Sequence, residues 1–144
     1  MESKYIKFLE HTADVEFEAL GNSLEQAFER AAIAMQSVMI DLHEVEKKVR
    51  REIVAEGEDN ESLLYDFLEK ILIINDSENI FFSEVKVSKI WKEGNKLKVS
   101  AVLLGEEFDP RKHRGRAVVK AVTYHGMRVG KKDGKFYVHV VLDI

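Results

Sequence analysis

The sequence contains no cysteine and only one proline, Pro110. Without cysteine, the chain can form no disulfide and offers no thiolate as a nucleophile or metal ligand. No apolar run approaches the roughly 20 residues that a membrane-spanning helix needs, and the first residues, MESKYIKFLE, show no hydrophobic signal segment. We therefore expect a cytoplasmic protein with no membrane partner.

The motifs of several common enzyme sites are also missing. There is no P-loop, no GxGxxG before a helix, no HExxH and no GxSxG. The formal net charge is −4, so the surface as a whole is not built to bind nucleic acid. Function must therefore be sought in smaller groups of polar residues.

The hydrophobic pattern predicts one domain over residues 1–144, because 45% apolar and 33% charged residues are typical of a globular chain. Residues 4–10 and 14–20 alternate as strands, and a capping box of Ser23 and Gln26 opens a helix to about residue 39. A strand around 49–55 precedes a second helix, roughly 60–74, which the segment NDSEN ends. A hairpin turning at Gly94-Asn95 and two strands within 115–144, around KKDGK, follow. This order predicts an α+β fold, mainly antiparallel sheet with two packed helices.

The segment FLEHTADVEFEAL places His11, Thr12 and Asp14 in an otherwise strand-like run. They can form a turn in which Asp14 caps backbone N–H groups, and Asp143, next to last, can be a solvated charge. If the two carboxylates converge, however, they make a site for a hard cation such as calcium, magnesium or manganese. The terminal carboxylate of Ile144, if this is the native end, would add a further oxygen.

Two groups of basic residues allow a similar choice. Lys120 lies in AVVKAVTYH between Val118 and Val122, and can be an edge-strand lysine that reaches water. Near the aspartates, it would instead balance negative charge or meet a phosphate. The segment DPRKHRGR, residues 109–116, is more often a solvated loop than a phosphate or RNA contact.

Three segments together resemble the archease family: FLEHTADVEFEALGNSLEQAFERAA, then VVKAVTYHGM, then the terminal VVLDI. The resemblance runs over essentially the whole chain. It implies a compact β-sheet sandwich flanked by two helices. It also implies an accessory protein of the GTP-dependent tRNA-splicing ligase RtcB, which promotes guanylylation of the ligase, supports its multiple turnover and can broaden its nucleotide use.

The resemblance also implies a site. The metal-binding aspartates of the family match Asp14 and Asp143, with Ile144 beside a divalent cation that is most often calcium, although magnesium or manganese remains open. Lys120 and His11 match the remaining residues of a ligase-activating tip. Many members have glycine where this chain has Glu16, which shares a strand face with Asp14 and would add a carboxylate near the cation.

Two other functions remain as alternatives: a small metal-dependent phosphoesterase using Asp14, Asp143 and Lys120, and a direct tRNA-binding module. The sequence offers few general-base candidates and no recognised nucleophile, which favours a non-catalytic protein. Under the leading interpretation, the partner is an RtcB-type RNA ligase, and tRNA is reached indirectly through it.

Overall fold

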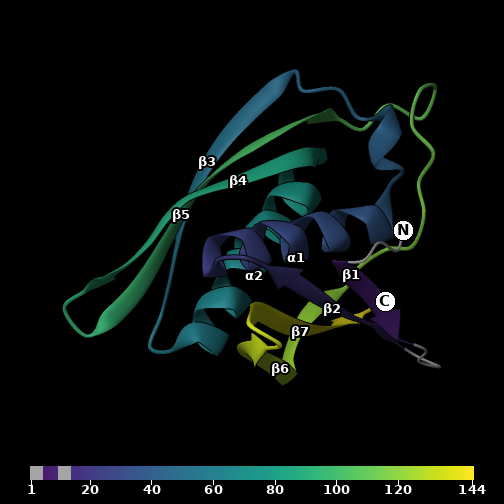
Figure 1. Ribbon diagram of the computed structural model, residues 1–144. Helices are drawn as coiled ribbons and strands as arrows, with labels where there is room; N and C mark the ends of the chain where they lie inside the picture. Colours follow the sequence, from purple (N-terminus) through teal and green to yellow (C-terminus); the bar gives the residue numbers. More distant parts are fainter. Residues whose placement is uncertain (1–4, 10–13) are drawn as a thin grey trace.

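A computed structural model describes residues 5–9 and 14–144 of the chain (Figure 1). The elements, in chain order, are β1 (Ile6–Leu9), β2 (Asp14–Gly21), α1 (Leu24–Met39), a short 3-10 turn (Leu42–Glu44), β3 (Val49–Gly57), α2 (Asn60–Glu78), β4 (Ile80–Glu93), β5 (Lys96–Glu107), β6 (Ala121–Lys132) and β7 (Lys135–Asp143). No helix in these described ranges is both long and apolar enough to cross a membrane.

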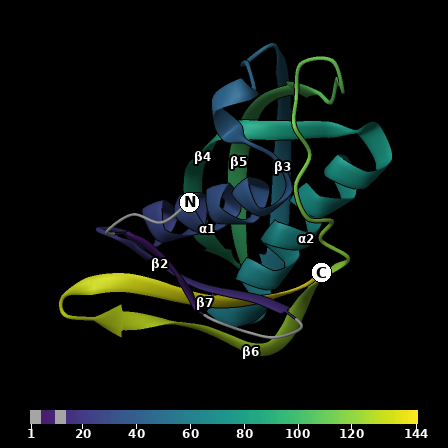
Figure 2. The same ribbon diagram turned by 90° about the vertical axis from the view of Figure 1, so that its right-hand side faces the viewer.

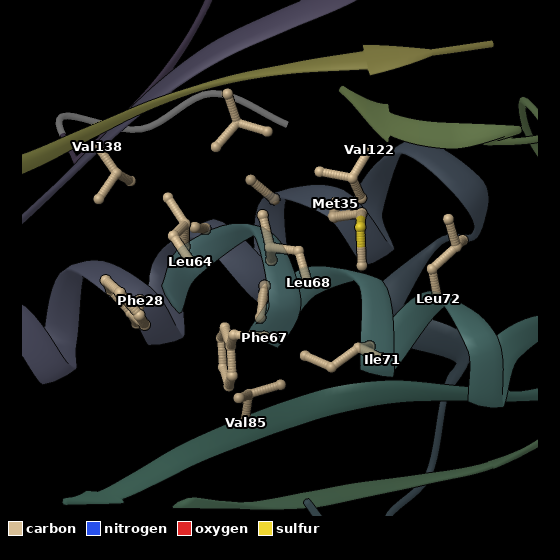
Figure 3. Close-up of a cluster of buried hydrophobic side chains, with 14 of the residues drawn as sticks. Phe28, Met35, Leu64, Phe67, Leu68, Ile71, Leu72, Val85, Val122 and Val138 are labelled. Atoms are coloured by element: carbon tan, nitrogen blue, oxygen red, sulfur yellow. The ribbon is translucent and has the colours of Figure 1, made fainter. Parts of the chain in front are cut away.

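The strands form two antiparallel sheets, one of four strands in the order β1-β2-β7-β6 and one of three in the order β3-β5-β4. Both helices lie between the sheets (Figure 2). In Figure 3, Phe67 and Leu68 of α2 lie between Val122 and Val138 of one sheet and Val85 of the other. The predicted α+β class with antiparallel sheets and two helices is thus confirmed, and the helices occupy the middle layer.

This middle position explains why the apolar stripe of α2 is wide. A helix that contacts a sheet on each side must bury two faces. The fully or almost fully buried side chains of α2 accordingly occupy adjacent as well as i, i+4 positions: Leu63, Leu64, Phe67, Leu68, Ile71 and Leu72. The core therefore runs continuously from one sheet, through both helices, to the other.

Both helices begin at a polar cap, and the predicted capping box of Ser23 and Gln26 forms only in part. The Ser23 side chain accepts from Gln26 N at 3.0 Å, but Gln26 Oε1 accepts from Asn22 N, one residue before the cap. At α2, Asp59 accepts from Ser62 N at 2.8 Å, and the Ser62 hydroxyl accepts from Asp59 N at 3.1 Å. The two polar caps thus satisfy N–H groups that a helix start leaves open.

The predicted end of α2 at residue 74 is wrong, because the helix continues to Glu78. Asn75 is buried, and its amide exchanges hydrogen bonds of 2.8 and 3.0 Å with Gln36 of α1. It also donates to Ile80 O at 2.7 Å. The helix ends at Asn79, whose φ of 57° is left-handed. A contact between the two helices therefore keeps a polar residue helical where local sequence indicates a stop.

The prediction that a strand spans Lys120 is also wrong, since β6 begins at Ala121. The backbone before it instead binds the last turn of α1: Arg116 N donates to Met39 O at 2.8 Å and Ala117 N to Val38 O at 3.1 Å. A helix end leaves its final carbonyls without partners, and this distant segment supplies donors to them. Val118 is 73% exposed as a result.

Helix carboxylates cap backbone N–H groups on three outer strands. Glu29 of α1 accepts from Val87 N of β4 at 2.8 Å. From α2, Asp66 accepts from Glu56 N of β3 at 2.9 Å, and Glu61 accepts from Val129 N of β6 at 3.1 Å. Unpaired strand edges invite pairing with other chains, and these carboxylates occupy part of each edge.

Gly105 of β5 faces a bulge of β4, where the pairing shifts between Phe82 and Glu84. A Cβ atom at this position would lie 1.8 Å from Phe81 O. We predict that Gly105→Ala lowers the free energy of unfolding by about 1–3 kcal/mol, because the strand must move to admit a methyl group. Urea unfolding measures this change.

Gly115→Ala is the matched control, since its Cβ would meet only the Phe108 ring at 3.8 Å. This change should alter stability by less than about 0.5 kcal/mol. Equal effects of the two substitutions would contradict the steric argument.

Candidate functional site at the end of the four-stranded sheet

The register between β2 and β7 brings the two predicted aspartates together. Asp14 lies directly opposite Asp143, at the end of eight consecutive antiparallel pairs. On both strands the alternate residues, such as Phe17 and Val140, are buried against the helices, so the aspartates point to the outer face. Residues opposed in this way have Cβ atoms about 4.5–5.5 Å apart. Two segments from opposite ends of the chain thus present two half-buried carboxylates side by side.

Lys120 joins this pair through its backbone. Its N–H donates to Asp143 O at 2.7 Å, and the next residue, Ala121, pairs with Asp143 on the second side of β7. The lysine side chain is exposed. Ile144 directly follows β7 and is 36% exposed. The structure therefore gathers Asp14, Asp143, Lys120 and Ile144 at one end of the sheet, whereas His11 lies outside the described residues.

The donor chemistry of this end fits a hard cation. Like charges directly opposite on an antiparallel pair destabilise it, and a divalent ion between Asp14 and Asp143 would remove that repulsion. Carboxylate oxygens are the ligands that calcium and magnesium prefer. Within residues 5–9 and 14–144, no group of three or more His, Cys, Asp or Glu side chains is placed to hold a metal. Backbone oxygens and water would have to complete the coordination of an ion here.

A residue that sequence reasoning missed, His139, adjoins the pair. Its Nε2 lies 2.5 Å from Glu16 Oε1, and its Nδ1 lies 2.7 Å from Gly126 O. A carbonyl oxygen only accepts, so the hydrogen of this contact is on Nδ1, while Nε2 faces the Glu16 carboxylate. Glu16, two residues from Asp14, therefore has one oxygen bound to His139.

The position of His139 depends on an irregularity in β6. Between the pairs Thr123↔Val141 and Arg128↔His139, β6 has several extra residues, and Gly126 within them has a φ of 81°. This bulge covers the imidazole, which is only 3% exposed. In the sequence, His139 alternates with apolar residues and shares a strand face with Asp143. The bulge that buries it, however, could not be predicted from local sequence.

Comparison with known proteins identifies the family. The model of the Archease protein family (MTH1598/TM1083) matches residues 6–144. The chain belongs to the archease family. "Protein archease" of Pyrococcus abyssi is 49% identical to it over 138 residues, which are 94% of this chain and 95% of that protein. "Protein archease" of Sulfolobus acidocaldarius is 43% identical over 138 residues, 96% and 97% of the two chains.

Two solved structures share the archease fold seen here. The solution structure of protein 1598 of Methanobacterium thermoautotrophicum has a TM-score of 0.85 at 38% identity, and covers 99% of this chain and 100% of its own. A crystal structure of an archease from Thermotoga maritima has a TM-score of 0.60 at 26% identity, and covers 96% of each chain. The latter protein is described as a possible chaperone.

In this archease, the basic segment 109–116 is bound to carboxylates of the same chain. Lys112 contacts Glu46 and, at 2.8 Å, Glu106, and Arg116 lies 3.8 Å from Asp41. His113, only 4% exposed, donates from Nε2 to Glu106 at 2.8 Å, because its Nδ1 accepts from Asp109 N. The segment is therefore neither a plain solvated loop nor a free cationic surface.

Glu106 is the centre of this network. Burial by itself would raise the pKa of its carboxyl, but hydrogen bonds from the backbone N–H of Glu46, from Lys112 and from His113 outweigh burial and lower the pKa to about 2, from 4.5. The charged carboxylate holds the segment between β5 and β6, which leads directly to Lys120. A structural ion-pair network thus holds the segment that leads to Lys120.

The lowered pKa of Glu106 predicts acid sensitivity. A carboxyl whose pKa falls on folding stabilises the protein above its unfolded pKa, near 4.5, and that contribution is lost as the pH falls toward about 2. Glu106→Gln should lower the free energy of unfolding at neutral pH by about 1.5–3 kcal/mol, because it removes charged hydrogen bonds. Urea unfolding at several pH values measures both effects.

Between pH 4.5 and 2, the free energy of unfolding should fall less in Glu106→Gln than in the wild type. Glu107→Gln, at the exposed neighbouring position, is the control and should keep the wild-type profile. A Glu106→Gln protein with an unchanged acid profile would remove Glu106 from the centre of the network.

Proposed function

We propose that this archease-family chain is a non-catalytic accessory protein of an RtcB-type, GTP-dependent RNA ligase. It acts through the end of the four-stranded sheet that carries Asp14, Asp143 and Lys120, promotes guanylylation of the ligase and supports its turnover. The observation that carries this proposal is the register of β2 with β7, which opposes Asp14 and Asp143 beside the backbone of Lys120. Membership of the archease family supports it.

The arrangement suits a protein that acts on a partner's site. Two carboxylates and an exposed ammonium lie at the end of a sheet, next to the exposed Val118 and the last residue, Ile144. A bound divalent ion, calcium, magnesium or manganese, would supply a positive centre for phosphate oxygens. In this proposal, the chain holds such an ion between Asp14 and Asp143. It also presents the Lys120 ammonium to anionic groups of the ligase–nucleotide complex.

Metal binding should be visible in the stability of the isolated protein. A ligand that binds only the folded state stabilises it by about 2.7 kcal/mol at a hundredfold excess over its dissociation constant. We predict that calcium, magnesium or manganese raises the melting temperature, and that Asp14→Asn abolishes the increase. Differential scanning fluorimetry with and without chelator measures this difference.

In the presence of chelator, the melting temperature of Asp14→Asn should be the same as in the presence of each ion, since the variant lacks a carboxylate that would bind the ion. Asp76→Asn, an exposed aspartate of α2, should respond to metal like wild type. Melting curves of the wild type that ignore all three ions would count against the site.

The activity itself is tested with the cognate ligase, GTP and a divalent ion, by the rate at which guanylylated ligase forms. Asp143→Asn and Lys120→Met should each lower the stimulation by about tenfold or more, because each removes a charged contact of about 1.5–3 kcal/mol. Lys120→Arg should recover only part of it, because a planar guanidinium does not replace a compact ammonium.

Asp76→Asn and Lys92→Met, which remove the same charges at exposed positions on α2 and β4, are the matched controls and should stimulate fully. If Asp143→Asn and Lys120→Met stimulate guanylylation as strongly as wild type and the two controls, the proposed site is refuted. Nucleotide hydrolysis by the protein alone, lost in Asp143→Asn, would instead favour a metal-dependent phosphoesterase.

A further inference from the structure

The positive charges of this protein fall into two kinds, according to what they contact. In segment 109–116, Arg111, Lys112 and Arg116 all lie near carboxylates of the same chain. These ion pairs offset part of the charge of the three residues, although the Arg111 side chain is 89% exposed. Among the described residues, no ion pair involves Arg114, the fourth cation of the segment. The basic cluster that is most apparent in the sequence is therefore partly paired within the chain.

A different group of cations contacts mainly uncharged atoms. It extends from the middle of the four-stranded sheet, where Arg128 pairs with His139, to the β6–β7 turn, where Lys132 pairs with Lys135. Lys135 Nζ lies 2.6 Å from the amide oxygen of Asn22, and Arg128 Nε donates to the Tyr137 hydroxyl at 3.3 Å. Neutral partners leave the positive charge of both residues uncompensated. This end of the sheet, around the β6–β7 turn, therefore carries charge that is available to an anion.

These residues share the outer face of the sheet. Arg128 pairs with His139, Gly130 with Tyr137, and Lys132 with Lys135, so all six positions lie on the face away from the buried Val138 and Val140. On the other side of β2, Lys7 of β1 lies opposite Glu18, which has the same orientation. We call Lys7, Arg128, Lys132, Lys135 and Tyr137 the hairpin patch.

The hairpin patch contains a hollow. A cavity of about 290 Å³ is lined by Lys7, Lys132 and Lys135, together with Tyr5, Glu18, Leu20 and Asp133. The carboxylate of Glu18 lies 3.8 Å from Lys132 Nζ, so one ammonium is partly balanced. Three ammonium groups against two carboxylates, with Arg128 nearby, leave a positive local balance on a chain whose net charge is −4.

Tyr137 adds a flat aromatic surface between the cations. A Cβ atom at Gly130 would lie 3.3 Å from the ring, so the ring rests against the β6 backbone. Both helices lie on the other side of this sheet (Figure 2). An aromatic ring on an open sheet face, with cations along a track, is the arrangement that binds single-stranded nucleic acid by base stacking and phosphate contacts.

We propose that the hairpin patch binds single-stranded RNA, with backbone phosphates at Lys7, Lys132, Lys135 and Arg128 and one base stacked on Tyr137. This deepens the proposed function, on which it rests, by giving the accessory protein its own contact with the RNA. The patch and the Asp14–Asp143 pair lie on the same face. Tyr137 and Asp143 are six residues apart along β7, or about 20 Å at 3.3 Å per residue. RNA held at the patch would thus lie along the face that also carries the tip.

The test is the binding of a fluorescein-labelled single-stranded oligouridylate to the isolated protein, followed by fluorescence anisotropy at increasing salt. Each phosphate contact on a single strand contributes about 0.7 to the slope of log affinity against log salt. Lys132→Gln with Lys135→Gln should therefore lower the slope by about 1.4, and weaken binding roughly 25-fold at about 0.1 M salt. Tyr137→Leu should weaken binding about fivefold or more, while Tyr137→Phe, which keeps the ring, should not.

The matched control is Lys86→Gln with Lys92→Gln, which removes two exposed lysines from β4 of the other sheet. This pair should leave affinity and slope nearly unchanged. A loss equal to that of the patch variant would mean diffuse electrostatic attraction, and would overturn the proposal, as would the absence of RNA binding by the wild type. Melting curves establish that each variant is folded.

Guanylylation assays without RNA separate this proposal from the proposed function. The lysine pair variant should stimulate guanylylation like wild type, and Asp143→Asn should bind oligouridylate like wild type. If the wild type does not bind RNA but still stimulates guanylylation, the RNA-binding proposal is wrong and the proposed function stands. If the variant with Lys132→Gln and Lys135→Gln binds RNA normally but no longer stimulates guanylylation of the ligase, the patch is a protein-binding surface and the RNA proposal is wrong.

Discussion

The register between β2 and β7 is the constraint on which the site depends. Because side chains alternate along a strand, a shift of one residue would turn Phe17 and Ala19 outward and Asp14 toward the helices. Burial of the apolar face therefore fixes the position of the aspartates. Asp14 and Asp143 lie opposite each other because the hydrophobic pairs in the same ladder set the register. Packing of the apolar face thus places the two carboxylates on the same outer face.

The two helices between the sheets connect the four-stranded sheet to the rest of the molecule. Each helix contributes apolar side chains to both sheets, and carboxylates of α1 and α2 reach backbone N–H groups on β3, β4 and β6. Contact between Gln36 and Asn75 joins the helices through buried amides. The edge strands β3, β4 and β6 are thereby partly occupied.

Charge is divided between the two ends of the four-stranded sheet and the segment beside it. Two carboxylates mark the Asp14–Asp143 end, cations mark the hairpin patch, and Lys112 and His113 of segment 109–116 bind Glu106. The net charge of −4 does not reveal this distribution, because it sums the charges of all regions of the chain. Under the two proposals, the Asp14–Asp143 end would bind a cation and the hairpin patch would bind a phosphate-bearing molecule, both on the outer face of one sheet.

The sequence by itself determined the class of fold, both helix starts, the hairpin at Gly94 and the alternation that turns Asp14 and Asp143 outward, because these depend on local periodicity, caps and turns. Tertiary structure decided the rest. Local pattern could not reveal that Asn75 stays helical through Gln36, that residues before Lys120 bind the end of α1, or that the basic segment folds onto Glu106. Nor could it show that His139 is covered by a bulge or that Lys7 reaches the cations of the β6–β7 turn. Each of these joins residues far apart in the chain, and their energies exist only when packing brings the partners together.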